Sequence, residues 1–281
     1  LISATLLLLT VPGVALFYGG MVRKINVLNT VALPFVALAL VSVEWGSFGE
    51  WLTFSPQIDG SVRHASGPES LLLLRHGITA ALALALVTGG IVERIRFSFF
   101  LLFGSLWIVV VYMPLAYWIW GNGWLVNLGC LDFAGGAVIH ISAGVSALVA
   151  AVVIGPRRGY GRIEMMPNHL PFSFCGAALM WVGWFGFSNG PGLASMATTT
   201  GAFVAIQMSA VTAALTWMIA EWLQRDKPTA LGTMSGAVAG LVAIAPAAGY
   251  VDPLSAMVIG IGAGGLCYMV VNYVKLILGY D

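Results

Sequence analysis

His140 combines a titratable side chain with a segment that is otherwise apolar. The residues from Asp132 to Gly144 read DFAGGAVIHISAG. An ionisable side chain at membrane depth is costly, and it usually faces the interior of a helix bundle or a pathway where it can exchange a proton. His140 is therefore the first candidate functional residue. The competing interpretation is a histidine that only hydrogen-bonds to a neighbouring helix.

The composition indicates that membrane helices position this histidine. The 281 residues are 59% hydrophobic and 8% charged, whereas about a quarter of the residues of a soluble domain are charged. The net charge of +1 gives no basis for nucleic-acid binding. The three cysteines have no metal-site spacing, and their odd number argues against a disulfide framework. No nucleophile–base motif, metal cluster or phosphate-binding loop is present, so we expect neither an enzyme nor a bound cofactor or metal.

Apolar runs separated by polar residues predict one all-α, multi-pass membrane domain over residues 1–281. Because the first residue is leucine, we expect the natural start to lie upstream and the first span to be slightly trimmed. The nine expected spans are 1–21, 26–53, 69–91, 97–119, 134–155, 168–189, 197–223, 230–248 and 254–275.

The basic residues predict the orientation of these spans. If the N-terminus lies outside, ten of the twelve Lys and Arg residues fall on the cytoplasmic side, which is a strong positive-inside bias. Only Arg63 and Arg75 fall outside. The ten inside residues are Arg23, Lys24, Arg94, Arg96, Arg157, Arg158, Arg162, Arg225, Lys227 and Lys275.

Five runs together resemble the ammonium transporter family (Amt/Mep, related to Rh proteins). Their residue types and order match along the whole chain, and the DFAGG…H run is the most specific of them. They are PGVALFYGG (12–20), ERIRFS (93–98), DFAGGAVIH (132–140), GWFGF (183–187) and PAAGY (246–250).

The resemblance implies a fold of eleven spans with two inverted five-helix repeats, of which this chain carries about nine spans. It also implies a homotrimer in the plasma membrane, with a narrow apolar pore for ammonium or ammonia in each protomer. A midplane site between inverted repeats is a general transporter design. Family members often dock a signalling protein of the PII type on the cytosolic face. The basic loop 157–162 is a candidate for that contact, or simply a positive-inside anchor.

The resemblance also assigns roles to five residues. His140 matches the first of two pore histidines that form a proton relay. Trp120 matches the tryptophan that recruits ammonium in the outer vestibule, and Asp132 matches the vestibule carboxylate. Phe187 matches the second of two gate phenylalanines, and Trp184 matches a tryptophan that lines the lower pore.

The chemistry of these residue types is consistent with such a pore. An indole face attracts a cation by about 0.5–2 kcal/mol, but it attracts K⁺ as well. Ammonium differs from K⁺ because it can leave a proton on a neutral imidazole while NH₃ crosses the apolar stretch. Asp132 has a competing structural role, since a carboxylate at a helix start accepts backbone N–H bonds.

The sequence departs from the family pattern at several positions. The chain ends at Asp281, before the span expected to carry the second histidine, so we expect it to lack the last two spans. Thr79 stands where the first gate phenylalanine is expected, and Pro191 stands in place of the vestibule serine. Glu44 lies near the outer end of the second span, where the family is apolar.

The outer ends of the second and third spans carry an unusual group of polar residues. Charges at membrane depth tend to pair, so one hypothesis is that Glu44 or Glu50 pairs with Arg75 or His76. The alternative is that Glu50, Arg75 and His76 extend separately to the headgroup region.

The leading functional prediction is transmembrane transport of ammonium or ammonia. The alternative is a membrane receptor domain that senses ammonium at Trp120 without conducting it, because signalling homologues also depart from the transport pattern.

Overall fold

A computed structural model describes residues 1–54, 68–189, 195–279 and 281. Every regular element in these ranges is a helix or a helical turn, which confirms the all-α prediction. Arg63 and Pro191 lie outside the described residues. The α-helices are α1 (Ile2–Leu8), α2 (Thr10–Met21), α3 (Val27–Glu44), α4 (Glu50–Phe54), α5 (Pro68–Ile91), α6 (Phe97–Trp107), α7 (Met113–Trp120), α8 (Trp124–Asn127), α9 (Ser142–Ile154), α10 (Leu170–Trp184), α11 (Met196–Arg225), α12 (Ala230–Ile244), α13 (Pro253–Met269) and α14 (Lys275–Leu278).

Eight continuous helical segments in the described residues are long and apolar enough to cross a membrane. They correspond to eight of the nine expected spans, mostly with ends within a few residues of the expected positions. The largest difference is that the fourth span continues to Asn127. The segments are Ile2–Met21, Lys24–Phe54, Ser70–Ile91, Phe97–Asn127, Gly136–Ile154, Leu170–Ser188, Met196–Arg225 and Pro253–Leu278.

The expected span 230–248 is shorter than predicted. Its helix, α12, has 15 residues and ends at Ile244, whereas about 20 helical residues are needed to cross the hydrocarbon core. Residues 245–250 form turns, and the carbonyl of Pro246 accepts a hydrogen bond from the Phe133 amide at 3.1 Å. Apolar composition alone could not reveal this break, because the turn residues are as apolar as the helix before them.

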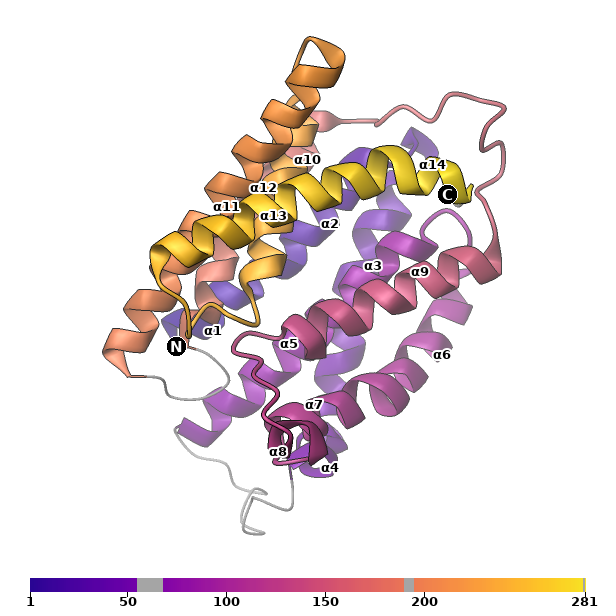
Figure 1. The fold of residues 1–281 in the computed structure, drawn as a ribbon. Helices are drawn as coiled ribbons and strands as arrows, with labels where there is room; N and C mark the ends of the chain where they lie inside the picture. The colour runs from indigo at the N-terminus through magenta and orange to yellow at the C-terminus, as the bar shows by residue number, and fades with distance from the viewer. Residues whose placement is uncertain (55–67, 190–194, 280) are drawn as a thin grey trace.

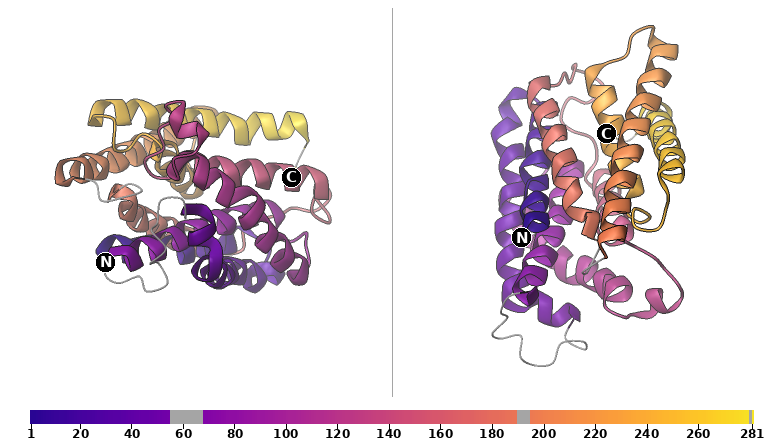
Figure 2. Two further views of the ribbon diagram at one scale, coloured as in Figure 1. Left: turned by 90° about the horizontal axis from the view of Figure 1, so that it is seen from below. Right: turned by 90° about the vertical axis from the view of Figure 1, so that its left-hand side faces the viewer.

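Helix α5 is the central helix of the bundle. It packs against α1, α2, α3 and α9, and 67% of the residues in its most apolar stretch are buried inside the protein. Helices α2 and α3 lie behind it in Figure 1, while α13 crosses the front of the molecule. The two views in Figure 2 likewise place α3 and α13 on opposite sides. Any residue on the inner face of α5 therefore lies deep in the protein.

Several helix segments contain a wider, π-helical turn. These turns lie at Trp45–Gly49, Ile108–Tyr112, Gly136–Ile141 and Val270–Val274. Single π-helical turns within α-helices are frequent at functional sites. His140 lies in the third of them.

Glycines allow α2 and α10 to pack backbone to backbone. A Cβ atom on Gly176 would contact the Phe17 amide and the Gly13 carbonyl, and one on Gly13 would contact Met180. Gly183 lies equally close to Thr10 of α2. The glycines of the runs at 12–20 and 183–187 thus hold the end of α10 in the core.

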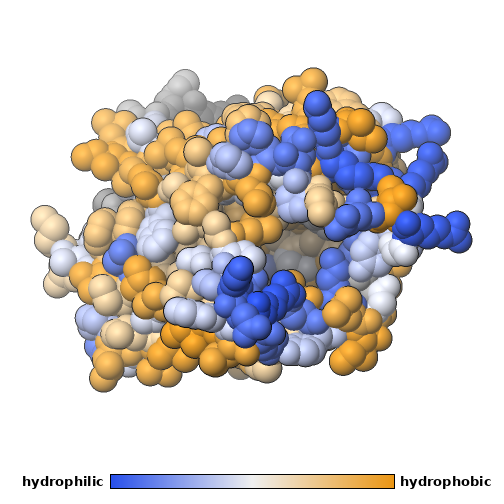
Figure 3. Space-filling model, turned by 90° about the horizontal axis from the view of Figure 1, so that it is seen from above, coloured by the Kyte–Doolittle hydropathy of each residue, from blue (hydrophilic) through white to orange (hydrophobic). Residues whose placement is uncertain are grey.

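Most of the basic residues predicted on the cytoplasmic side follow helices that end at the same end of the bundle. This is the upper end in Figure 1. Figure 3 views this end and shows hydrophilic side chains in patches among apolar ones. Arg158 and Arg162 are exposed there, whereas Arg23, Arg94 and Arg157 are half-buried. The clustering is the one that the positive-inside pattern predicts.

Gly176→Ala is expected to destabilise the protein by about 1–3 kcal/mol, because the added methyl group overpacks the contact between α2 and α10. Thermal unfolding in detergent measures the loss. Gly262→Ala is the matched control, since nothing lies within 4 Å of its Cβ position. Equal stability of the two variants would contradict the close contact.

Candidate functional site

The carboxylate of Asp132 organises the start of the helix that carries His140. Its Oδ1 atom accepts hydrogen bonds from the amides of Gly135 and Gly136 at 2.8 and 2.6 Å. Its Oδ2 atom accepts from Ala137 and Val138 at 2.8 and 3.1 Å. These four amides belong to a helix start, where N–H groups have no intrahelical acceptor. The capping role expected for Asp132 is therefore confirmed.

The tight loop after Asp132 depends on its glycines and on the PAAGY run. Gly135 has a φ of +90°, which side-chain-bearing residues rarely adopt. A Cβ atom on Gly136 would overlap the Pro246 ring, and one on Gly249 would overlap the Phe133 ring. Phe133 also packs edge-on against Tyr250. Two of the sequence runs thus form one structural unit.

The same loop holds Trp120, the last residue of α7. The indole Nε1 donates a hydrogen bond to the backbone carbonyl of Asp132 at 2.8 Å. The residue is half-buried. Asp132 therefore positions the helix of His140 through its side chain and Trp120 through its backbone.

His140 is buried against Trp184. Its ring is 9% exposed and stacks on the indole of Trp184 with centroids 5.2 Å apart and an interplanar angle of 12°. Within the described residues, neither ring nitrogen of His140 nor the Trp184 Nε1 has a hydrogen-bond partner. Buried polar atoms are rarely left unpaired, and those that are call for a specific explanation, such as a functional one.

A small cavity lies among the helices and is lined by Trp120, Thr79 and Phe187. Phe187 lies in the helical turn Phe185–Asn189 that follows α10. The Thr79 hydroxyl, on α5, lies 3.1 Å from the Tyr112 hydroxyl and donates to the His76 carbonyl. The lining residues are Arg75, His76, Thr79, Trp120, Phe133, Ala134 and Phe187.

Aromatic contacts link this outer cavity to His140. The rings of Phe187 and Trp184 have centroids 5.6 Å apart, and Trp184 stacks on His140. Trp184 and Phe187 are each 1% exposed. The structure thus places Trp120, Thr79 and Phe187 around one cavity, and ring contacts connect Phe187 through Trp184 to His140. Asp132 lies beside Trp120, to which its carbonyl is bonded.

The polar group at the outer end forms specific pairs. The His76 Nδ1 atom lies 3.0 Å from Glu50 Oε1, which confirms one of the pairings considered from the sequence. Arg75 donates instead to the Ser3 hydroxyl at 3.3 Å. Glu44 does not take part, and its Oε2 atom is buried with no partner in the described chain. Because Glu50 and Arg75 are 7% and 8% exposed, the alternative of separate extension to the headgroups is wrong.

Trp45 and Tyr112 are site residues that the sequence reasoning missed. The Trp45 Nε1 atom donates to Glu50 Oε2 at 2.6 Å, and the Trp45 ring packs edge-on against Tyr112 and His76. A tryptophan five residues before a carboxylate in an apolar run was the available signal. It was overlooked because tryptophans near span ends usually act as interfacial anchors.

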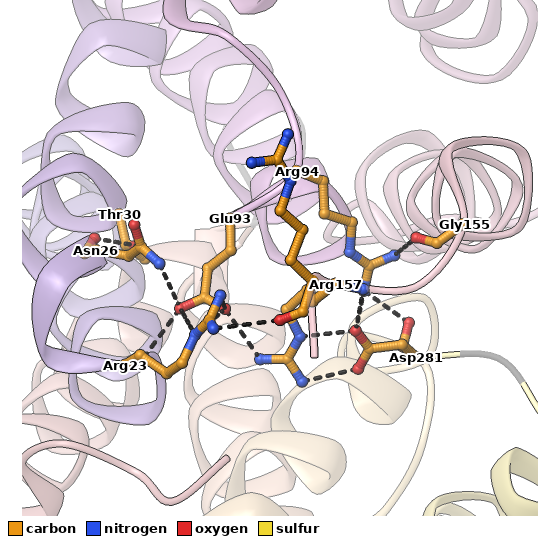
Figure 4. Close-up of polar contacts among 9 residues, drawn as sticks. Arg23, Asn26, Thr30, Glu93, Arg94, Gly155, Arg157 and Asp281 are labelled. Carbon is orange, nitrogen blue, oxygen red and sulfur yellow. Dashed lines mark hydrogen bonds and ion pairs between the residues drawn. The ribbon is translucent and has the colours of Figure 1, made fainter. Parts of the chain in front are cut away.

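At the opposite end, Glu93 is the centre of an ionic network (Figure 4). Its carboxylate accepts from Arg23 Nε at 3.1 Å and from Asn26 Nδ2 at 2.8 Å, and it lies 3.5 Å from Arg157 Nη1. Glu93 has a φ of +62°, in the left-handed region, so the chain changes direction sharply at this residue after α5. The ERIRFS run thus fixes the loops at this end. Arg157 is held here and also pairs with Asp281 at 2.7 Å.

Eight helical segments in the described residues are long and apolar enough to cross a membrane, and a buried histidine lies among them. These features define the class as a multi-pass membrane protein. The family model described as "Ammonium Transporter Family" matches residues 1–281. The chain belongs to this family.

Similar proteins agree with this assignment. A putative ammonium transporter of Methanothermobacter thermautotrophicus is 43% identical over 99% of the chain, which covers 72% of that protein. The crystal structure of Candida albicans Mep2 superposes with a TM-score of 0.89 at 32% identity, over all of this chain and 66% of Mep2. A structure described as "Sensor Amt Protein" gives a TM-score of 0.92 at 25% identity, over all of this chain and 75% of that one. The chain thus spans about two-thirds to three-quarters of these relatives.

Glu93→Gln is expected to lower stability at neutral pH and to weaken its loss in acid. Burial opposes ionisation of Glu93, but hydrogen bonds from Asn26 and Arg23 outweigh it and hold the pKa below the usual carboxyl value. The ionised group therefore stabilises the fold above about pH 4.3, its ordinary pKa, and this contribution is lost as the pH falls through the lower folded pKa.

Thermal unfolding of the wild type and the variant between pH 3 and pH 7 measures this effect, with pH values chosen around the ordinary carboxyl pKa of about 4.3. Glu164→Gln is the control, because Glu164 is an exposed carboxylate. The assignment fails if Glu93→Gln retains the acid dependence of the wild type.

Proposed function

We propose that this chain forms the conducting part of a transporter for ammonium or ammonia. The observation that carries the proposal is the chain of ring contacts from Phe187, at the Trp120 cavity, through Trp184 to His140, whose ring nitrogens are unpaired in the described chain. Membership of the ammonium transporter family supports it. A path with aromatic walls and one titratable group is suited to a small molecule that can shed its charge.

Trp120 would recruit the ion at the outer end. Its Nε1 is held by the Asp132 carbonyl, so the indole is fixed at the cavity that it lines. A cation over an indole face gains about 0.5–2 kcal/mol. K⁺ gains this as well, so recruitment alone cannot select ammonium.

Selection would occur beyond Phe187, where the path becomes apolar. Moving a charged ion through such a segment costs several kcal/mol. His140 would accept and pass on the proton while neutral ammonia crosses, because its ring nitrogens have no protein partner in the described chain. K⁺ has no proton to give up and would be excluded at this step.

A sensing function is the second candidate. The observation that favours it is the similarity to the structure described as "Sensor Amt Protein". Thr79 also occupies the position of a gate phenylalanine, which alters the constriction beside Phe187. In this case Trp120 would bind ammonium and His140 would only pack against Trp184.

We further propose a homotrimer in the plasma membrane with the N-terminus outside, because the basic residues gather at the opposite end. Exposed apolar side chains on α9 and α13, among them Val153 and Val258, are suited to lipid or to a second copy of the chain. A PII-type protein would dock on Arg158 and Arg162, which are exposed, rather than on Arg157, which is held in the Glu93 network.

His140→Ala is expected to abolish the ammonium-evoked current of the full-length protein in proteoliposomes, or to make the current unselective for K⁺. Removal of the imidazole removes the group that would accept the proton. His169→Ala is the control, because His169 is exposed and lies outside the path. A wild-type protein without current, whose tryptophan fluorescence is nevertheless quenched by ammonium, would contradict transport and favour sensing.

A further inference from the structure

Glu50 and His76 form an oriented pair at the outer cavity. Both Glu50 oxygens lie within 3.1 Å of His76 Nδ1, and Trp45 Nε1 fixes the Glu50 carboxylate from the other side at 2.6 Å. The hydrogen bond on one ring nitrogen sets the tautomer of a histidine. With Nδ1 donating to the carboxylate, Nε2 carries the lone pair and can accept a proton.

The His76 side chain forms part of the wall of a small cavity. His76 lines the cavity that also contains Trp120 and Phe187. Its Nε2 atom has no hydrogen-bond partner in the described chain, whereas Nδ1 is fully engaged. The side chain is 13% exposed, so water can also reach it. A carboxylate that orients the imidazole and leaves its second nitrogen without a protein partner is the arrangement of a general base.

Arg75 adds a positive charge to the same cavity. It is 8% exposed, and among the described residues no carboxylate lies within ion-pair distance of it. A cation in this cavity is repelled by the guanidinium, whereas neutral ammonia is not. Because the guanidinium opposes a second positive charge whether it lies on ammonium or on the His76 ring, a carboxylate beside the ring is needed to stabilise its protonated form.

We propose that His76 accepts a proton from ammonium at the outer cavity and that Glu50 is the positioning residue that stabilises the resulting imidazolium. One N–H bond of NH₄⁺ breaks, its electron pair stays on nitrogen to give NH₃, and the proton binds His76 Nε2. The Glu50 carboxylate then balances the charge of the ring. The proposal rests on the transport function proposed above and deepens it: His76 is the first acceptor of the proton, which must then reach His140 for charge to cross the pore.

Other groups that carry or could carry charge lie near this pair. Arg75 is on the same helix, Tyr112 bonds to Thr79, Asp132 precedes the Phe133 that lines the cavity, and Glu44 precedes Trp45. The Asp132 carboxylate is fully engaged by backbone amides. Glu50 is the carboxylate in contact with the His76 ring, so it is the one whose charge should control the affinity of His76 for a proton.

The test is the dependence of the ammonium-evoked current on external pH in proteoliposomes that contain the full-length protein. Hydrated protons compete with ammonium for Nε2, so the wild-type current should fall on the acid side. Glu50→Gln keeps the acceptor for Trp45 but removes the negative charge that favours a protonated ring. Its acid limb should lie at lower pH than that of the wild type, because the ring loses the neighbouring negative charge.

Glu44→Gln is the matched control, because it removes a carboxylate from the same membrane segment but not one that contacts His76. Its acid limb should coincide with that of the wild type. His76→Gln should lower the current by about 100-fold, the order of a general base contribution. Thermal unfolding of each variant verifies folding, and Glu50→Gln keeps the test informative if His76→Gln does not fold.

Three results would overturn the inference. One is a Glu50→Gln variant whose current decreases with no shift of the acid limb, which indicates a structural role only. The second is a Glu44→Gln variant that shifts equally, and the third is a His76→Gln variant with the wild-type profile. If the wild type carries current, these results overturn only the role of His76 and leave the transport proposal standing. If the wild type carries no current, the transport proposal and the role of His76 both fail.

Discussion

Four hydrogen bonds to one carboxylate hold the site together. Asp132 caps the helix start that leads to His140, and its carbonyl binds Trp120. In a membrane interior, backbone N–H groups cannot turn to water, so an uncapped helix start there is costly. Hydrogen bonds to charged groups contribute about 1.5–3 kcal/mol each. Asp132 therefore positions both Trp120 and the helix that carries His140.

Each end of the bundle contains a carboxylate that must be stabilised by hydrogen bonds, and the partners differ between the two ends. At the outer end the buried Glu50 is matched by His76 and Trp45, and at the opposite end Glu93 is matched by Arg23 and Asn26. Glu93 bonds to permanently charged and amide donors, which makes its network static. Glu50 bonds to a ring whose charge can change. The Glu50–His76 pair is therefore suited to the proton exchange proposed above, and the Glu93 network is suited to fixing loops.

Much of the fold followed from the apolar runs, because each run long enough to cross a membrane must bury its backbone in a helix. The span predicted at 230–248 is shorter in the structure, where α12 ends at Ile244. The turn after it includes the contact between Pro246 and Phe133, which no local pattern encodes. Capping by Asp132 was predictable from a carboxylate before two glycines. The sequence allowed Glu44 or Glu50 to pair with Arg75 or His76. The pair Glu50–His76 could be identified only from the positions of the helices in the structure.

The roles of His140, Trp120, Phe187 and Trp184 came from the family resemblance rather than from the residues alone. In the structure Trp120 and Phe187 line one cavity, ring contacts connect Phe187 through Trp184 to His140, and the transport roles of these residues are proposals. Thr79 lines the same cavity as Phe187, so a hydroxyl group as well as aromatic rings surrounds this cavity. This difference from the family pattern is local and leaves the Asp132 unit unchanged.

Backbone hydrogen exchange of residues 133–141 tests the central role of Asp132 most directly. In the full-length protein, the amides of Gly135 to Val138 should exchange slowly although they have no intrahelical acceptors. In an Asp132→Asn variant these amides should exchange much faster, and the emission of Trp120 should shift because its carbonyl partner moves. Slow exchange in both proteins, with an unchanged Trp120 signal, would contradict the claim that this carboxylate holds the site together.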